Sequence, residues 1–237
     1  MIDLLPTPGT AVIVATLALA CGAAAAALSA WLHSRRGLRA PYTRKIFHFL
    51  IISIAALVQL RWGLPGTMTY GSTVALVVLY AVLRGDGFPF YEALARPSDA
   101  PHRSRFIVVP LITTAAGGLL ANLLFPATAW VGYVAVAVGD AVGEPVGTRW
   151  GRHRYTVPSL SRSVSATRSL EGSSAVFGAT LVAVAAALLL AGHPPADALS
   201  VAVAVAAATA VVEAASHHGL DNLTIQLAAA GVAALLL

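Results

Sequence analysis

Long uncharged apolar segments, separated by short polar connections, run through the whole chain of 237 residues. Eight of them reach the roughly 17 residues that a helix needs to cross a bilayer. Apolar and polar residues do not alternate as they would in strands, and Ala, Leu and Val dominate, which favours helices over a membrane barrel. The predicted spans lie near residues 10–32, 46–62, 67–83, 105–125, 127–148, 170–192, 196–215 and 221–237.

Composition indicates a membrane protein rather than a water-soluble one. Charged residues make up 11% of the chain and apolar residues 58%, with a mean hydropathy of +0.79, whereas soluble domains carry about 25% charged residues. The sequence therefore predicts an all-α polytopic membrane helix bundle of about 7–8 transmembrane helices, organised as a single transmembrane domain over residues 1–237. A single cysteine, Cys21, excludes an intramolecular disulfide and zinc sites with several cysteines.

The basic residues predict how the helices are oriented. There are 15 Lys and Arg against 10 Asp and Glu, and every basic residue except Arg61 lies in or at the edge of three alternate connections. Since cytoplasmic loops are enriched in Lys and Arg, we expect loops 33–45, 84–104 and 149–169 to face the cytoplasm. In a membrane protein, an excess of basic over acidic residues favours contact with anionic lipid or with an anionic ligand. We expect no nucleic-acid partner.

Carboxylates inside or at the ends of the predicted spans are the first candidates for a functional site. A charged group within a span costs about 2.5–3.5 kcal/mol on insertion scales, so it is usually retained for function. In the predicted topology, acidic and amide side chains from four spans gather at the cytoplasmic end. These residues are Asp140, Glu144, Glu171, Glu213, Asp221 and Asn222.

Asp140 and Glu144 lie four residues apart and so share one face of a helix. Two carboxylates on one face repel each other unless a positive group lies between them. Hard oxygen donors without a His or Cys cluster favour Mg²⁺, which usually brings phosphate with it. The alternative is an ion pair with an intramembrane Lys or Arg, but the sequence places none within a span near the depth of Asp140.

A stripe of glycines follows the same helix. Gly139, Gly143, Gly147 and Gly151 repeat every four residues, a spacing that also permits close helix packing in membranes. Pro145 removes a backbone donor and is expected to break the helix, and broken backbone at membrane depth is tolerated where it lines a cavity or is buried in protein. We therefore interpret the stripe as the floor of a ligand pocket, with helix packing as the alternative.

The predicted loop 149–169 combines hydroxyl and basic side chains next to the start of a helix. Ser165, Arg168 and Ser169 supply donors that, together with the helix dipole, can hold a polyphosphate. The chain contains no Walker A sequence and no protein-kinase glycine loop. By composition alone, a solvated basic loop facing lipid headgroups fits equally well, and the neighbouring carboxylates favour the phosphate interpretation.

Separated blocks of this sequence resemble the CTP-dependent polyprenol kinases, a family that includes phytol, dolichol and related diacylglycerol kinases. The blocks are 44–48 (RKIFH), 139–147 (GDAVGEPVG), the segment 165–172 ending RSLEG, and 219–225 (GLDNLTI). They span most of the chain, and their order and spacing carry the resemblance. At two positions the chain departs from the family pattern, since Arg168 stands where relatives often have Lys and Gln226 where many have Pro.

The resemblance implies transfer of the γ-phosphoryl group of CTP to the hydroxyl of a membrane-dissolved isoprenoid alcohol at the cytoplasmic leaflet, with Mg²⁺. The metal set is Asp140, Glu144 and Asp221. The nucleotide-binding set is Arg168, Ser165, Ser169, Gly139, Gly143, Gly172 and Asn222. The catalytic set is Asp140, Glu171 and Lys45, and the sequence leaves open whether Asp140 or Glu171 accepts the proton of the alcohol.

Other functions remain open at this stage. The Gly-Asp and Glu-Gly blocks are also similar to those of phosphatidate cytidylyltransferases, in which attack falls on the α-phosphorus of CTP. Diacylglycerol is a further possible acceptor, and neither the particular alcohol nor the oligomeric state follows from the sequence. An ion-coupled transporter would use Asp140 and Glu144 as an ion site at a broken helix. The gathering of acidic residues at one leaflet and the absence of an inverted repeat in the sequence disfavour that class.

Overall fold

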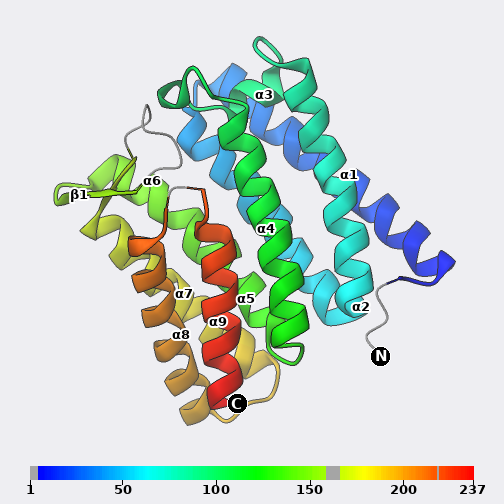
Figure 1. Cartoon of the computed structure of the whole chain (residues 1–237), viewed down its shortest axis with the longest axis vertical. Coiled ribbons are helices and arrows are strands. Elements are labelled where there is room, and N and C mark those ends of the chain that lie inside the picture. The colour runs from blue at the N-terminus through cyan, green and yellow to red at the C-terminus, as the bar shows by residue number, and fades with distance from the viewer. Residues whose placement is uncertain (1–4, 159–165, 218) are drawn as a thin grey trace. The chain divides into compact units, whose positions relative to one another are not determined.

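The computed structural model describes residues 5–158, 166–217 and 219–237. Helices make up nearly all of this part of the chain (Figure 1), which confirms the predicted helical membrane fold. Among the described residues, five helices are long and apolar enough to cross a membrane. They are α1 (Pro8–Arg36), α2 (Ala40–Arg84), α4 (Arg105–Leu124), α7 (Leu170–Leu190) and α8 (Pro195–Ala215).

The chain forms two compact units, Met1–Leu111 and Ile112–Leu237. In the first unit, α1 and α2 pack along each other through small side chains. Gly22 lies on the buried face of α1, where an added Cβ would meet the side chain of Val77 at 3.5 Å and that of Val74 at 3.8 Å. Small residues at such a contact let two membrane helices approach closely, and this maximises their van der Waals packing.

The long helix α2 is divided at Gly63. Its 45 residues, at about 1.5 Å each, exceed twice the ~30 Å of a bilayer core. At Gly63 the backbone adopts φ 62° and ψ −158°, a conformation that is essentially restricted to glycine. The Thr67 hydroxyl lies 2.9 Å from the Gly63 carbonyl oxygen and 2.8 Å from Gln59 Oε1, and its one proton is shared between these two acceptors. Two helical halves therefore follow each other without a loop.

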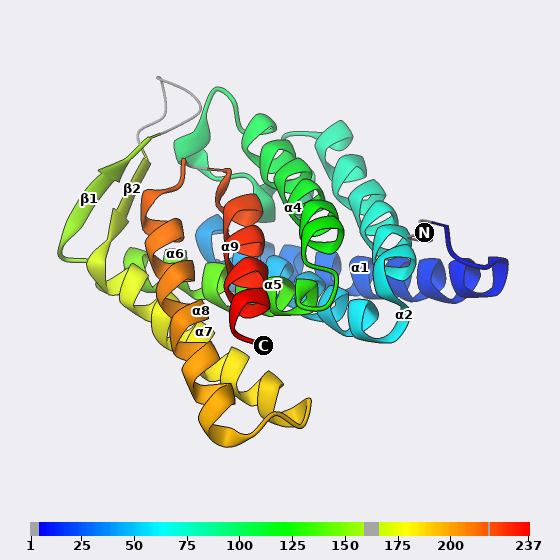
Figure 2. The same ribbon diagram turned by 60° about the horizontal axis from the view of Figure 1, so that its bottom comes forward.

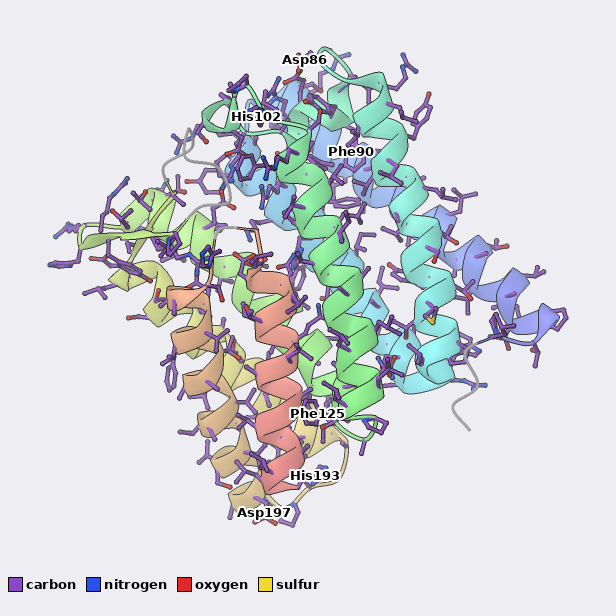
Figure 3. All side chains as sticks on the ribbon, in the orientation of Figure 1. Asp86, Phe90, His102, Phe125, His193 and Asp197 are labelled. Carbon is purple, nitrogen blue, oxygen red and sulfur yellow. The ribbon has the colours of Figure 1, made fainter. Side chains whose placement is uncertain are left out.

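The connection after α2 is folded against the rest of the first unit. It contains α3 (Pro89–Leu94) and a 3₁₀ turn, η1 (Pro97–Asp99). The Thr43 hydroxyl of α2 donates to the Ala93 carbonyl at 2.7 Å, and the rings of Phe47 and Phe90 lie 4.9 Å apart. Figure 3 labels Phe90 together with Asp86 and His102 of this connection.

Arg103 organises the polar side of that connection. It donates to Asp86 Oδ1 and to Glu92 Oε2, both at 2.6 Å, and to the Ala95 carbonyl at 3.0 Å. The hydrogen bond from Arg103 lowers the pKa of Glu92, and this effect outweighs the opposing effect of partial burial. The loop predicted over 84–104 is thus an ordered cap on the ends of α1 and α2.

The second unit contains the end of α4 and the elements that follow it. These are α5 (Ala129–Ala135), a π-helical turn η2 (Val136–Asp140), α6 (Ala141–Trp150), strands β1 (Arg154–Val157) and β2 (Ala166–Ser169), α7, α8 and α9 (Asp221–Leu236). α7 packs on α6 and α8, and α9 packs on α5 and α8 (Figure 2). The two strands pair antiparallel at the start of α7, while His193 and Asp197 lie at the other end of α7 and α8 (Figure 3).

The helix break predicted at Pro145 is wrong. The backbone leaves α-helical geometry at Val136–Asp140 instead, and α6 begins immediately afterwards at Ala141. Pro145 therefore lies in the second turn of a new helix, where its missing N–H costs a single bond to the first residue of that helix. The irregular segment contains both Gly139 and Asp140, and π-turns of this kind are frequent at functional sites.

Candidate functional site

A largely buried arginine, Arg168, lies between two carboxylates in the second unit. Its Nη1 is 2.8 Å from Glu213 Oε1, and its Nη2 is 3.1 Å from Asp221 Oδ2. The three residues come from β2, the end of α8 and the start of α9, and no side chain among them is more than 16% exposed. Because the arginine is shared, one cation fixes three separate elements at the same end of the unit.

The charge of Arg168 is maintained by its neighbours. Burial acts to lower the pKa of Arg168, but Glu213, Asp221 and, more weakly, Asp140 raise it overall. Asp140 is itself buried and is the last residue of the π-turn. The sequence places Arg168 in a loop, so sequence reasoning missed the positive group that lies close enough to Asp140 to interact with it.

A chain of hydrogen bonds connects this cluster to β1. Ser173 donates to Glu213 Oε2 at 3.2 Å, and the Tyr155 hydroxyl lies 2.7 Å from Ser173 Oγ. Tyr155 is the residue paired with Arg168 across the two strands. Both strands of the sheet therefore reach Glu213, one through Arg168 and the other through Tyr155 and Ser173.

Asp221 and Asn222 begin α9 beside Arg168. The Asn222 backbone N–H donates to Asp221 Oδ1 at 3.1 Å, and Asn222 Nδ2 donates to Thr114 Oγ1 at 2.7 Å. Asn222 Oδ1 is buried and has no hydrogen-bond partner among the described residues. A buried acceptor without a donor costs about 1–3 kcal/mol, and such an oxygen next to carboxylates fits a ligand for a hard cation.

The carboxylates converge on Arg168 rather than on one another. Within the described part of the chain, no three Asp, Glu, His or Cys side chains form a ready-made metal site. The donors near Arg168 are nevertheless oxygens of the type that Mg²⁺ prefers, namely those of Asp140, Asp221 and Asn222. The residues present therefore fit a magnesium ion that arrives with an anionic ligand better than a permanently bound one.

Ser169 and Glu171 fix the junction between β2 and α7. Ser169 Oγ accepts the Gly172 N–H at 3.1 Å and caps the helix. The Glu171 carboxylate accepts the backbone N–H groups of Arg152 at 3.1 Å and His153 at 3.3 Å, and it lies 2.7 Å from His153 Nδ1. Both oxygens of Glu171 are thus engaged in holding the start of β1. A role for Glu171 as proton acceptor stays a prediction.

The glycine stripe is the contact between α6 and α7. A Cβ at Gly139 would collide with the Thr180 hydroxyl, one at Gly143 would lie 2.8 Å from Val176 Cγ2, and one at Gly147 would lie 3.0 Å from Ser169 Oγ. The helix-packing alternative accounts for the spacing, so the interpretation as an open pocket floor is not needed to explain it. Nucleotide contact by Gly139, Gly143 or Gly172 stays a prediction.

For the remaining predicted residues, the structure gives only their positions in the fold. Lys45 belongs to the first unit, where it is buried near the start of α2. Glu144 lies on α6, and Ser165 falls outside the described residues. The sequence marked Glu213 as one of the gathered acids but assigned it to none of the metal, nucleotide-binding or catalytic sets. No comparable signal marked Tyr155 or Ser173, because their participation depends on the pairing of two short strands.

Together, the fold and this cluster define a multi-spanning helical membrane protein with a charged, partly desolvated site at one end of its second unit. The chain is 30% identical over 210 residues to a phytol kinase from Synechocystis sp., an alignment that covers 88% of this chain and 85% of that protein. The chain therefore belongs to the polyprenol and phytol kinase family, as its sequence blocks indicated. No family model and no solved structure matches it.

Proposed function

We propose that the protein is a kinase that transfers the γ-phosphoryl group of CTP to the hydroxyl of a phytol-type isoprenoid alcohol. The observation that carries the proposal is the buried Arg168, shared between Glu213 and Asp221, in a chain related to a phytol kinase. The relationship supports a kinase and the class of the acceptor. The choice of CTP as donor and of Mg²⁺ as metal rests on the pattern of residues. The choice of the cytoplasmic leaflet rests on the distribution of basic loops.

Arg168 is suited to bind the transferred phosphate. Phosphoryl transfer requires mainly positioning and charge neutralisation, and a guanidinium offers two parallel donors that match phosphate oxygens. Without nucleotide, both of its carboxylate partners neutralise it. A polyphosphate carries more negative charge than Asp221, so we infer that Arg168 exchanges Asp221 for phosphate while Glu213 keeps it aligned.

The exchange would free Asp221 at the moment when the nucleotide arrives. Asp140, Asp221 and Asn222, with Glu144 in support, would hold Mg²⁺, which when bound neutralises charge on the phosphates. Asn222 Oδ1, buried without a hydrogen-bond partner among the described residues, fits this role. Ser169, already fixed as the cap of α7, would present the N-terminus of that helix to an anion.

Asp140 is the better candidate to accept the proton of the alcohol. It is buried beside the cluster, whereas Glu171 already accepts two backbone N–H groups and contacts His153. A general base must lie within hydrogen-bond reach of the hydroxyl whose proton it accepts. The acceptor alcohol would keep its isoprenoid chain in the bilayer and present only its hydroxyl at this end of α7 and α8.

The test uses purified protein in detergent with γ-³²P-labelled CTP, ATP, GTP or UTP, Mg²⁺ or EDTA, and a panel of prenols, diacylglycerol and phosphatidate. We expect label on a prenol with CTP and Mg²⁺, loss of transfer in Asp140→Asn, and unchanged transfer in the control Asp197→Asn, at the other end of α8. Labelled pyrophosphate released only with phosphatidate would instead indicate a cytidylyltransferase. Failure to bind any nucleotide would favour the ion-coupled transporter.

A further inference from the structure

An exposed group of basic and apolar side chains lies next to the proposed site on the second unit. Trp150, the last residue of α6, is 60% exposed, and Leu170, the first residue of α7, is 59% exposed. The exposed residues Arg149, Arg152 and Arg154 adjoin them in sequence. We call these five residues the interfacial patch.

Local contacts make the patch a continuous surface. The Leu170 N–H donates to the His153 carbonyl at 3.0 Å, and Arg154 is paired with Ser169 across the two strands. The Arg152 backbone is held by Glu171, the residue after Leu170. The segments 149–154 and 169–171 are therefore fixed side by side where α6 ends and α7 begins.

The arginines of the patch are available to an external anion. Arg149 lies over the Trp150 ring, 5.3 Å from its centroid. Among the described residues, no carboxylate forms an ion pair with Arg149, Arg152 or Arg154, and Glu171 nearby is committed to His153 and to backbone N–H groups. Three guanidinium groups without an ion pair among the described residues therefore adjoin an exposed indole.

We propose that the interfacial patch binds the phosphate headgroups of anionic phospholipids. Trp at the ends of membrane helices lies at the level of the headgroups, and exposed arginines beside it can bind a lipid phosphate with two donors each. A basic residue near an anionic bilayer contributes roughly fivefold in affinity. The occupant is thus an anionic lipid rather than a zwitterionic one.

Lipid binding at the patch would also act on the proposed kinase site, an extension that rests on the proposed function. Arg154 and Tyr155 belong to β1, and their partners across the sheet are Ser169 and Arg168. A headgroup held by β1 would therefore fix the sheet from which Arg168 reaches Glu213 and Asp221. We expect transfer to be faster in bilayers that contain anionic lipid.

The test compares wild type with the triple variant Arg149→Gln/Arg152→Gln/Arg154→Gln in nanodiscs made from phosphatidylcholine with or without phosphatidylglycerol. Lipids that remain bound are counted by native mass spectrometry after release from the nanodisc. We expect wild type to prefer phosphatidylglycerol and the triple variant to lose at least tenfold of that preference. Arg61→Gln is the matched control, because Arg61 lies over Trp62 at the same 5.3 Å in the first unit.

Equal lipid preference in the triple variant and wild type would overturn the proposal. Loss of CTP binding with lipid preference intact would assign the arginines to the nucleotide instead, and would also overturn it. Lipid counting does not depend on catalysis, so it gives an answer even if the protein phosphorylates no alcohol. If the triple variant does not fold, the single variant Arg152→Gln provides the same comparison, since the Arg152 side chain is exposed and its contact with Glu171 is made by the backbone.

Discussion

At the scale of single residues, the arrangement around Arg168 depends on one buried cation shared by two carboxylates. Removing one member of a buried ion pair leaves the other charge desolvated and typically costs 3–5 kcal/mol. Arg168 has two carboxylate partners, so its loss would leave two unpaired acids, whereas loss of Glu213 would leave a pair. The arginine should therefore tolerate substitution less well than either acid.

We predict that Arg168→Ala destabilises the protein by about 3–5 kcal/mol, because Glu213 and Asp221 lose their shared cation. Adding Glu213→Gln should recover part of that loss, since one buried charge is removed. Unfolding in detergent, followed by circular dichroism for the single and double variants, measures both effects. A double variant no more stable than Arg168→Ala would show that the two residues are not energetically coupled.

Asn222 offers a direct test of the metal proposal. We predict that Asn222→Ala raises the Mg²⁺ concentration for half-maximal activity by at least about tenfold, because even the loss of a residue that only orients a metal ligand typically costs 10–100-fold in metal affinity. Thr114→Val is the matched control, since it removes the hydrogen bond to Asn222 Nδ2 and leaves Oδ1 in place. If both variants shift the Mg²⁺ dependence equally, the effect comes from the orientation of Asn222 and not from its oxygen.

Most individual acids of the site were visible in the sequence, but their partners were not. Asp140, Asp221 and Asn222 stand out because polar groups are costly near membrane spans. Arg168 was assigned to phosphate without any indication that two carboxylates would share it. Ion pairs between residues 45 and 53 positions apart depend on how three elements meet, and no local pattern in the chain encodes that geometry.

At the scale of elements, the contact between α6 and α7 leaves no space for side chains. We predict that Gly172→Ala destabilises the protein by about 1–3 kcal/mol, because its Cβ would lie 2.8 Å from the Gly143 carbonyl oxygen. Gly178→Ala, on the same helix with no atom within 4 Å, should be neutral or stabilising by up to about 1 kcal/mol. Thermal unfolding in one detergent compares the two, and equal effects would contradict close packing at Gly172.

The cap formed by residues 84–104 should respond to acid. The pKa of Glu92 is lowered mainly by the hydrogen bond from Arg103. The pair therefore stabilises the cap at any pH above the ordinary value of about 4.5, and this stabilisation is lost as the pH falls through the lowered value. Hydrogen exchange over 86–104, corrected for the intrinsic pH dependence, should show this loss in wild type.

The variant Glu92→Gln should abolish that dependence and give a weaker cap already at neutral pH. Asp86→Asn serves as its control, because Asp86 also contacts Arg103 but its side chain is 78% exposed, so solvent screens the pair. An acid response that persists unchanged in Glu92→Gln would assign it to another group.

Helices were easier to predict than the irregular segments between them. Long apolar segments impose helices, because a lipid environment leaves backbone groups no partner outside the helix. The π-turn at Val136–Asp140 has no such signature, and Pro145 drew attention to the wrong turn. The strands β1 and β2 have four residues each, too few for an alternating pattern to emerge from their mixed sequence.

At the scale of the whole molecule, orientation in the bilayer stays a prediction from the basic loops, and the single native cysteine makes it simple to test. In a Cys21→Ala background, we expect Thr156→Cys to react with a membrane-impermeant maleimide only after cells are opened. Asp197→Cys, at the opposite end of α8, should react in intact cells. Reversed labelling would place the Arg168 cluster on the outer side and would contradict the positive-inside rule for this chain.

The division of α2 at Gly63 has a practical consequence for handling the protein. Two membrane-length helical halves are joined there by a single glycine with a positive φ, and the Thr67 hydroxyl contacts the carbonyl of that glycine. The junction between the two halves therefore contains no stretch of free chain that an antibody could recognise or a protease could cut. An inserted epitope tag would have to displace the Thr67 contact, so tags are better placed elsewhere.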